Sequence, residues 1–424
     1  MTADVPERLL AGMKQAAAEY GYGGASVARV VAAGETSRAA FYQHFSSREE
    51  CFLAAYGAAL EAVEAAWEAV SDAPDRARSG LAALIETAEA DPALARLLLV
   101  EAWAGSRELQ TQHQRFLLEA ERAGLAASPC VLRLPPAAVQ GGVGSLLADH
   151  LLGAREATPE ELRPGFEGWL RSYAVAAGQP RWSEEDWARC GRIFVGDRAA
   201  APAPRRRLPR GRSALPPEAS AADRRERILD ATCEVVAEKG YGATTVADVV
   251  AAARVTRGAF YSHFQCKQEA LVAALTRKLQ ESVAAAAGEF FLGETWPERI
   301  WRGCDAFLTY VATHPEAAWL GFVEVFVAGE QALRKARENR LAFTLFLAEG
   351  YTQNARAERL PSICSDAITG AIEAIVRRQV LAGRVDRCRE LLPQCAYVAL
   401  APFIGPEAAC EMILARIPGD RQAA

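Results

Sequence analysis

The sequence has no apolar run long enough to cross a membrane, for which about 18 residues are needed. The stretch ALARLLLVEAW is interrupted by Arg96 and bounded by Glu101. The N-terminal residues carry charges where a secretory signal needs an apolar run. We therefore expect a soluble, cytoplasmic protein that makes no contact with membranes.

Patterns that support catalysis or metal binding are also missing. The chain has five histidines, none at a metal-ligand spacing, and ten cysteines scattered without a C-x-x-C pair. There is no G-x-S-x-G motif. These absences predict that the protein is not an enzyme, that it binds no metal and no cofactor, and that its thiols are buried and reduced.

Alternating β-branched residues, which are typical of strands, are nearly absent. The chain has instead alanine-rich apolar segments, with most of its 21 prolines and 32 glycines lying between them. This composition favours helices joined by short turns. The length of 424 residues favours two or three domains rather than one.

The chain repeats itself. The pentapeptide FYQHF at residues 41–45 returns as FYSHF at residues 260–264, and the offset of 219 holds without a gap from Leu9 to Tyr56. Weaker matches continue, including Glu101 with Glu324. The sequence therefore predicts two copies of one domain in tandem.

The second copy shows the pattern of a helix-turn-helix. Apolar residues such as Ile228, Leu229 and Val236 follow a helical period that Gly240 ends. Thr245 is placed to cap a short second helix, VADVVAAA, and Thr256 to cap RGAFYSHF. Two short helices joined by a tight turn, with a longer helix behind them, are typical of this motif.

The last of these helices has one face suited to a core and another suited to DNA. Phe260 and Phe264 are four residues apart and should pack inward. The outward residues are a cation, a residue without a side chain, a tyrosine and a small hydroxyl, which suit the phosphates and base edges of a major groove. They are Arg257, Gly258, Tyr261 and Ser262, and the first copy has Arg38, Ala39, Tyr42 and Gln43 in their places.

The segments TTVADVVAAARVTRGAFYSHFQCKQEALVAAL and ASVARVVAAGETSRAAFYQHFSSREECFLAAY resemble the DNA-binding head of the TetR (tetracycline repressor) family of transcriptional regulators. The resemblance implies an all-α subunit with a three-helix head and a larger helical body that binds a small molecule and dimerises. The residues expected at DNA, from the pattern and the resemblance together, are Ser26, Ser37, Arg38, Ala39, Ala40, Tyr42, Gln43, His44 and Arg48 in the first copy, and Thr245, Thr256, Arg257, Gly258, Ala259, Tyr261, Ser262, His263 and Lys267 in the second.

We therefore predict two tandem TetR-like units that bind a double-stranded DNA operator. The segments are a first head at 1–56, a first regulatory body at 57–197, a Pro/Arg-rich linker at 198–220, a second head at 221–275 and a second body at 276–424. The net charge of −5 means that affinity for DNA must come from locally placed cations. The linker arginines, with Arg224, Arg225 and Arg227 after them, either lie along phosphates or in a minor groove, or belong to a solvated linker that contacts nothing.

Both copies depart from the family at the turn. The position where the family usually has glycine holds Glu35 in the first copy and Arg254 in the second. A residue other than glycine in a left-handed turn costs roughly 1 kcal/mol, and an acidic one near phosphate is unfavourable. The first head is expected to be the weaker reader of DNA, or to have lost DNA binding.

A duplicated chain could act as a repressor in the form of an intramolecular pseudo-dimer with two half-sites. The copies are expected to pair through AAVQGGVGSLLADHLL and DAITGAIEAIVRRQVL, with Gly141, Gly142 and Gly144 permitting close packing. The two recognition helices differ at equivalent positions, with Ala39 aligned to Gly258 and Gln43 aligned to Ser262. The operator should therefore be an imperfect palindrome. A homodimer of the tandem chain is the alternative assembly.

The second body is rich in aromatic residues, which either form a plain core or line a pocket for a small apolar effector. The candidate pocket residues are Trp301, Phe307, Tyr310, Trp319, Phe322, Glu324 and Phe326, with Tyr310 or Glu324 as the polar handle. An alternative function is a redox-responsive regulator that uses a low-pKa thiol, Cys266 or Cys51, near a head.

Overall fold

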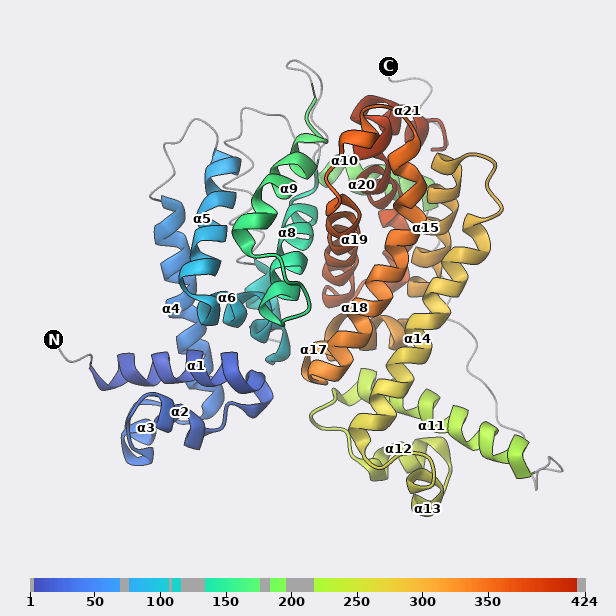
Figure 1. Cartoon of the computed structure of the whole chain (residues 1–424). Helices are drawn as coiled ribbons and strands as arrows, with labels where there is room; N and C mark the ends of the chain where they lie inside the picture. The colour runs from blue at the N-terminus through green and yellow to red at the C-terminus, as the bar shows by residue number, and fades with distance from the viewer. Residues whose placement is uncertain are drawn as a thin grey trace. The chain divides into compact units, whose positions relative to one another are not determined.

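The structure is a computed structural model that describes residues 4–68, 76–106, 109–115, 134–175, 184–195 and 217–417. Helices and short turns make up these ranges, and no β-strand runs through them (Figure 1). The prediction of an all-α fold is confirmed. Among the same residues, no helix combines the length and the apolar character that a membrane span requires.

The chain divides into two compact units, and each unit contains residues from both sequence copies. Unit 1 consists of Met1–Glu185, Ala348–Ile375 and Tyr397–Met412, and unit 2 consists of Asp186–Leu347, Val376–Ala396 and Ile413–Ala424. Each unit includes one complete head. The copies therefore exchange segments rather than forming two separate globules in sequence order.

The first head consists of α1 (Val5–Gly24), α2 (Val27–Ala33) and α3 (Arg38–His44). Asp4 caps α1 in a capping box with Glu7. The chain changes direction at Gly21, whose φ of 71° lies in the left-handed region that favours glycine. Leu9, Met13, Val30, Phe41 and Phe52 are fully buried between these helices and the start of α4.

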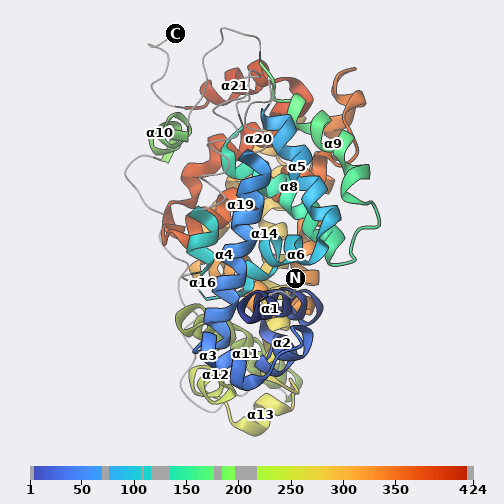
Figure 2. The same ribbon diagram turned by 90° about the vertical axis from the view of Figure 1, so that its left-hand side faces the viewer.

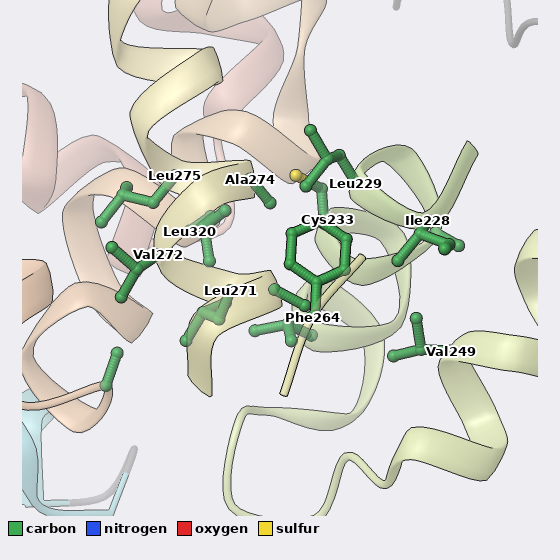
Figure 3. Packing of buried hydrophobic residues seen from close by; sticks show 14 of the residues in the cluster. Ile228, Leu229, Cys233, Val249, Phe264, Leu271, Val272, Ala274, Leu275 and Leu320 are labelled. Carbon is green, nitrogen blue, oxygen red and sulfur yellow. The ribbon is translucent and has the colours of Figure 1, made fainter. Parts of the chain in front are cut away.

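The second head repeats this arrangement with α11 (Pro217–Lys239), α12 (Val246–Ala253) and α13 (Arg257–Tyr261). Figure 3 shows side chains of α11, α12 and α14 meeting around Phe264. Ile228, Leu229 and Phe260 are fully buried, as their spacing predicts. The α11 helix begins at Pro217, so the last four residues of the predicted linker are helical. The linker arginines up to Arg212 lie outside the described residues.

The body of unit 1 extends upward from the first head along α4, as Figure 2 shows. Its helices from the first copy are α4 (Arg48–Glu68), α5 (Arg76–Ala90), α6 (Pro92–Leu99), η1 (Glu101–Ala104), α8 (Pro136–Leu151) and α9 (Pro159–Arg171). The second copy contributes η4 (Ala357–Arg359) and parts of η3 (Leu345–Thr352), α19 (Cys364–Leu381), α20 (Leu392–Ile404) and α21 (Pro406–Leu414).

The body of unit 2 is built around the antiparallel pair α14 and α15. Its helices are α14 (Lys267–Phe290), α15 (Trp296–Thr313), α16 (Pro315–Trp319), the π-helical turn η2 (Leu320–Glu324), α17 (Val325–Val327), α18 (Glu330–Thr344) and η5 (Val385–Leu391). The first copy contributes most of α10 (Glu184–Val195).

Within unit 1, α8 of the first copy lies against α19 of the second. A Cβ atom on Gly141 would overlap Ala374 and the carbonyl oxygen of Gly370. Conversely, a Cβ atom on Gly370 would lie 2.7 Å from the carbonyl oxygen of Gly141. The two backbones approach this closely only because both positions lack a side chain.

The prediction that Gly142 and Gly144 pack against the other copy in the way that Gly141 does is wrong. The space beside Gly142 is filled by Trp169 of α9, which belongs to the same copy. Gly144 lies near Leu99, with 3.7 Å between the position of a Cβ and Leu99 Cδ2, which is an ordinary contact. Of these three glycines, Gly141 contacts the other copy.

Polar contacts join the two copies in the same unit. The Tyr173 hydroxyl donates to the carbonyl oxygen of Val398 at 2.7 Å. Arg356 donates to the carbonyl oxygen of Ser172 at 2.5 Å. Arg155 pairs with Asp366, and both side chains are about four-fifths buried. Hydrogen bonds that are buried and charge-assisted fix the register of the helices that make them.

In unit 2, α10 of the first copy packs on the second copy. A Cβ atom on Gly191 would overlap the carbonyl oxygen of Glu390. The ring of Phe194 meets Trp301 edge to face, with 5.5 Å between the ring centroids. The Arg389 guanidinium lies 5.3 Å from the Phe194 centroid and donates to Asp305 at 2.7 and 3.0 Å. The exchange of segments is therefore reciprocal.

Candidate nucleic-acid interface

Hydroxyl caps fix where the short helices of each head begin. The Ser37 hydroxyl accepts a hydrogen bond from the Ala40 amide at 3.0 Å, and the Thr256 hydroxyl accepts one from the Ala259 amide at 3.1 Å. Ser26 caps α2, and Thr245 caps α12 in a capping box with Asp248. The caps predicted at Thr245 and Thr256 are confirmed, and each places an exposed hydroxyl at a helix start.

The turn before each recognition helix is left-handed. Glu35 has a φ of 48° and Arg254 a φ of 54°, and no other non-glycine residue in the described ranges has a positive φ. The left-handed turn predicted at these two positions is therefore present in both heads. Both side chains are exposed, so the two turns present opposite charges.

An arginine near the start of each head supports this turn. Arg8 donates to the carbonyl oxygens of Gly34 and Glu35. Arg227 donates to the carbonyl oxygen of Ala253 at 2.7 Å and to that of Arg254 at 2.6 Å. These carbonyls lie at or just after the C-terminal end of the second helix, where carbonyl oxygens lack intrahelical donors, and the guanidinium supplies donors there.

The donors of Arg227 are directed at the turn, which favours a structural role over the alternative of a phosphate contact. Arg225 lies 5.5 Å from the centroid of Phe264. Arg8 and Arg227 are separated by 219 residues, the offset of the repeat, so the sequence indicates that they correspond. Their acceptors could not be predicted, because they are backbone carbonyls, which every residue has.

The recognition helices bury one face and expose the other. Phe41 and Phe260 are fully buried, whereas Tyr42 is 60% exposed and Tyr261 is 56% exposed. The predicted DNA-facing residues that are exposed include Arg38, Ala39, Gln43 and His44 in α3, and Arg257, Gly258 and Ser262 in or directly after α13; Ala40, Ala259 and His263 are half-buried.

The two recognition helices end differently. The α3 helix continues through His44, whereas α13 ends at Tyr261 and Ser262 is its C-cap. The Ser262 hydroxyl donates to the carbonyl oxygen of Ala259 at 2.8 Å. The Gln43 side chain is therefore longer and carries an amide, while Ser262 presents a short hydroxyl whose proton is already donated.

Arg48 and Lys267, expected at DNA, are bound to backbone carbonyls at the end of the first helix of each head or just after it. Arg48 donates to the carbonyl oxygen of Tyr22 at 2.7 Å, and Lys267 donates to those of Tyr241 at 2.8 Å and Thr244 at 2.7 Å. Each cation also lies over its tyrosine ring, at 4.5 and 4.2 Å from the centroid. Burial lowers the pKa of the Lys267 amine.

The residues expected to line an effector pocket lie in several places. Trp301 and Tyr310 line a groove of about 630 Å³ on α14 and α15, together with charged residues such as Asp305 and Arg416. Phe307 packs on Phe343, with 5.1 Å between the centroids.

The remaining candidates make contacts elsewhere in unit 2. The carbonyl oxygen of Phe322 accepts a hydrogen bond from Arg377 at 3.2 Å, and the Arg377 guanidinium lies 4.9 Å from the ring centroid of Phe326. The Trp319 indole donates to Glu324 at 3.2 Å. Glu324 is not a free polar handle, because both of its oxygens accept hydrogen bonds from the protein.

The alternative prediction that Cys51 is a low-pKa redox thiol is wrong. This thiol is fully buried in the first head, and burial raises its pKa to about 12. The thiol is therefore protonated at neutral pH and cannot act as a low-pKa nucleophile. Cys266 is exposed just before α14.

Two three-helix heads, each exposing a tyrosine and an arginine from a short capped recognition helix, define a helix-turn-helix DNA-binding protein. The sequence profile of the family described as bacterial regulatory proteins, tetR family, matches residues 9–55 and 228–275. Residues 9–55 and 228–275 are therefore two copies of the DNA-binding domain of the tetR family of transcriptional regulators.

Each of the following relatives matches less than half of this chain. An uncharacterized HTH-type transcriptional regulator, YerO of Bacillus subtilis (strain 168), is 35% identical over 52 residues, which are 12% of this chain and 18% of that protein. The fatty acid degradation regulator FadR from Bacillus halodurans covers 41% of this chain and 97% of its own, at 19% identity and a TM-score of 0.38. FadR from Bacillus subtilis, solved in complex with stearoyl-CoA, covers 41% and 97%, at 18% identity and a TM-score of 0.36.

Proposed function

We propose that the protein is a cytoplasmic repressor that binds one operator as a single-chain pseudo-dimer, with one head on each half-site. The observation that carries this proposal is the contact of Gly141 on α8 with Gly370 on α19, one from each copy. Two-fold dimers of helix-turn-helix proteins present two heads to half-sites about one helical turn apart. A tandem chain that pairs its own copies needs no second subunit for this.

The reciprocal exchange of segments supports the same proposal. The copies are joined in unit 1 by Tyr173 with Val398 and by Arg155 with Asp366, and in unit 2 by Phe194 with Trp301. Contacts of this kind resemble an interface between subunits rather than a loose linkage between consecutive domains.

The half-sites of this operator should differ. A glutamine amide such as that of Gln43 can pair with adenine in the major groove through two hydrogen bonds. The short Ser262 hydroxyl, which already donates to a carbonyl oxygen, offers only acceptor positions. The operator is therefore an imperfect palindrome.

Binding-site selection from random DNA with the purified chain tests this proposal. The variants R38A and R257A should each lose about 1–3 kcal/mol of binding free energy and relax the sequence preference of a different half-site. Two results would contradict the proposal that each head recognises a different half-site. One is equal tolerance of base changes in both half-sites, and the other is a loss of sequence preference at the same base positions in both variants.

The repressor role includes release by a small effector bound in a body. Support comes from the groove beside Trp301 and Tyr310, whose volume of about 630 Å³ is that of a small-molecule site. A reporter gene controlled by the selected operator should be expressed less when the chain is present, and the R38A and R257A double variant should restore expression. Higher expression with the intact chain would contradict repression.

A further inference from the structure

Each head is joined to the body of its own unit by a buried glutamate. In unit 1, Glu101 Oε2 accepts a hydrogen bond from the Tyr22 amide at 2.6 Å. In unit 2, Glu324 Oε2 accepts one from the Tyr241 amide at 2.9 Å. The two glutamates are only 4% and 7% exposed, so these bonds form away from water. The same contact therefore occurs twice, at positions that correspond in the repeat.

The peptide that donates to the glutamate follows a glycine in the left-handed region. Gly21 has a φ of 71° and Gly240 a φ of 79°. This conformation ends the regular run of the first helix and directs the next amide toward the body. In both units, a Cβ atom added to the glycine would lie 3.6 Å from a carboxylate oxygen of the glutamate in the same unit.

The carbonyl group of the same tyrosine is held from the other side. Tyr22 accepts from Arg48, and Tyr241 accepts from Lys267. Arg48 and Lys267 are the first residues of α4 and α14, the helices that follow the recognition helices and continue into the bodies. Each tyrosine backbone is thus clamped between a carboxylate of the body and a cation close to the recognition helix.

The second oxygen of each carboxylate is also occupied. Glu101 Oε1 accepts from Arg96 at 3.0 Å, and Glu324 Oε1 accepts from the Trp319 indole at 3.2 Å. Burial raises the pKa of the Glu101 carboxyl. Glu324 closes the π-helical turn η2, and such turns are rare and occur frequently at functional sites.

We propose that Glu101 and Glu324 are positioning residues for DNA recognition, each fixing the orientation of its own head on its body. This inference rests on the proposed function, in which both heads read DNA. A shift of η1 or η2 would move the glutamate, the clamped tyrosine and the recognition helix together. The body can therefore control DNA binding without contacting DNA.

The test compares E324A and E101A with L308A, which removes a fully buried side chain from α15 that takes no part in the hydrogen bonds of the clamp. On the selected operator, E324A should weaken protection of the half-site read by the second head, by about tenfold in affinity, and E101A should do the same for the other half-site. L308A should lower thermal stability and leave both half-sites protected at temperatures where it is folded. Equal protection by E324A and L308A would overturn the proposal.

Hydrogen exchange without DNA provides a second readout. Amides of residues 240–245 should exchange faster in E324A than in the intact chain or in L308A, because the clamp is opened. Unchanged exchange would overturn the inference even if the chain binds DNA as proposed. If the intact chain binds no selected DNA, the proposed function fails, while the exchange result still decides whether the clamp exists. Should E324A fail to fold, W319F, which removes one donor to the same carboxylate, is measured in its place.

Discussion

Glu35 and Arg254 occupy the same left-handed position in the two helix-turn-helix turns, with φ angles of 48° and 54°. Glycine adopts this conformation without steric cost, whereas other residues lose roughly 1 kcal/mol. We predict that E35G and R254G each raise the free energy of unfolding by about 0.5–1 kcal/mol, measured by urea denaturation. A loss of stability in both variants would show that the turn is not left-handed.

The contact between α8 and α19 predicts unequal effects of two similar substitutions. G141A would place a methyl group against Ala374 and the Gly370 carbonyl, which should cost about 1–3 kcal/mol of unfolding free energy. G144A is the matched control, because its methyl group would make an ordinary contact with Leu99 and alanine favours a helix. Equal stability of the two variants in urea would contradict the packing of the two copies through these helices.

Arg227 distinguishes a structural cation from a phosphate contact. R227A removes the donors to the Ala253 and Arg254 carbonyls and should cost about 1–3 kcal/mol of unfolding free energy. The salt dependence of DNA binding should be unchanged. The measurement is operator affinity at several salt concentrations, and a decrease of about one in the slope would instead assign Arg227 to a phosphate.

The thiols near the heads should differ in reactivity. Because burial raises the pKa of Cys51 to about 12, iodoacetamide at pH 8 should leave this residue unmodified in the folded protein. The exposed Cys266 serves as the internal comparison and should be alkylated. Mass spectrometry of the digested protein measures both. Rapid alkylation of Cys51 would restore it as a candidate redox switch.

The sequence was sufficient to predict the elements whose signals are local. The caps at Thr245 and Thr256, the buried faces of Phe41 and Phe260, and the left-handed turns depend on residues only a few positions apart. The close approach at Gly141 was also predictable, because a glycine in a late helix lets another backbone pack closely against it. Gly142 was not distinguishable from it, since only the fold shows that Trp169 fills its space.

The contacts that organise the candidate site were harder to predict from the sequence, because their acceptors or donors are backbone atoms. Arg48, Lys267 and Arg227 bind carbonyl oxygens 23 to 27 residues away, and any residue type could supply those oxygens. The match of Glu101 with Glu324 was visible in the repeat. The sequence does not show that each carboxylate accepts a hydrogen bond from a backbone amide, and for this reason the prediction that Glu324 is the polar group of an effector pocket is wrong.

In the proposed assembly, one chain supplies both heads to one operator. Native mass spectrometry of the intact chain bound to the selected operator, with both half-sites present, counts the chains on each DNA duplex. We expect a complex of one chain per DNA duplex, formed without a dimer of chains in free solution. A complex that always contains two chains on a single pair of half-sites would contradict it.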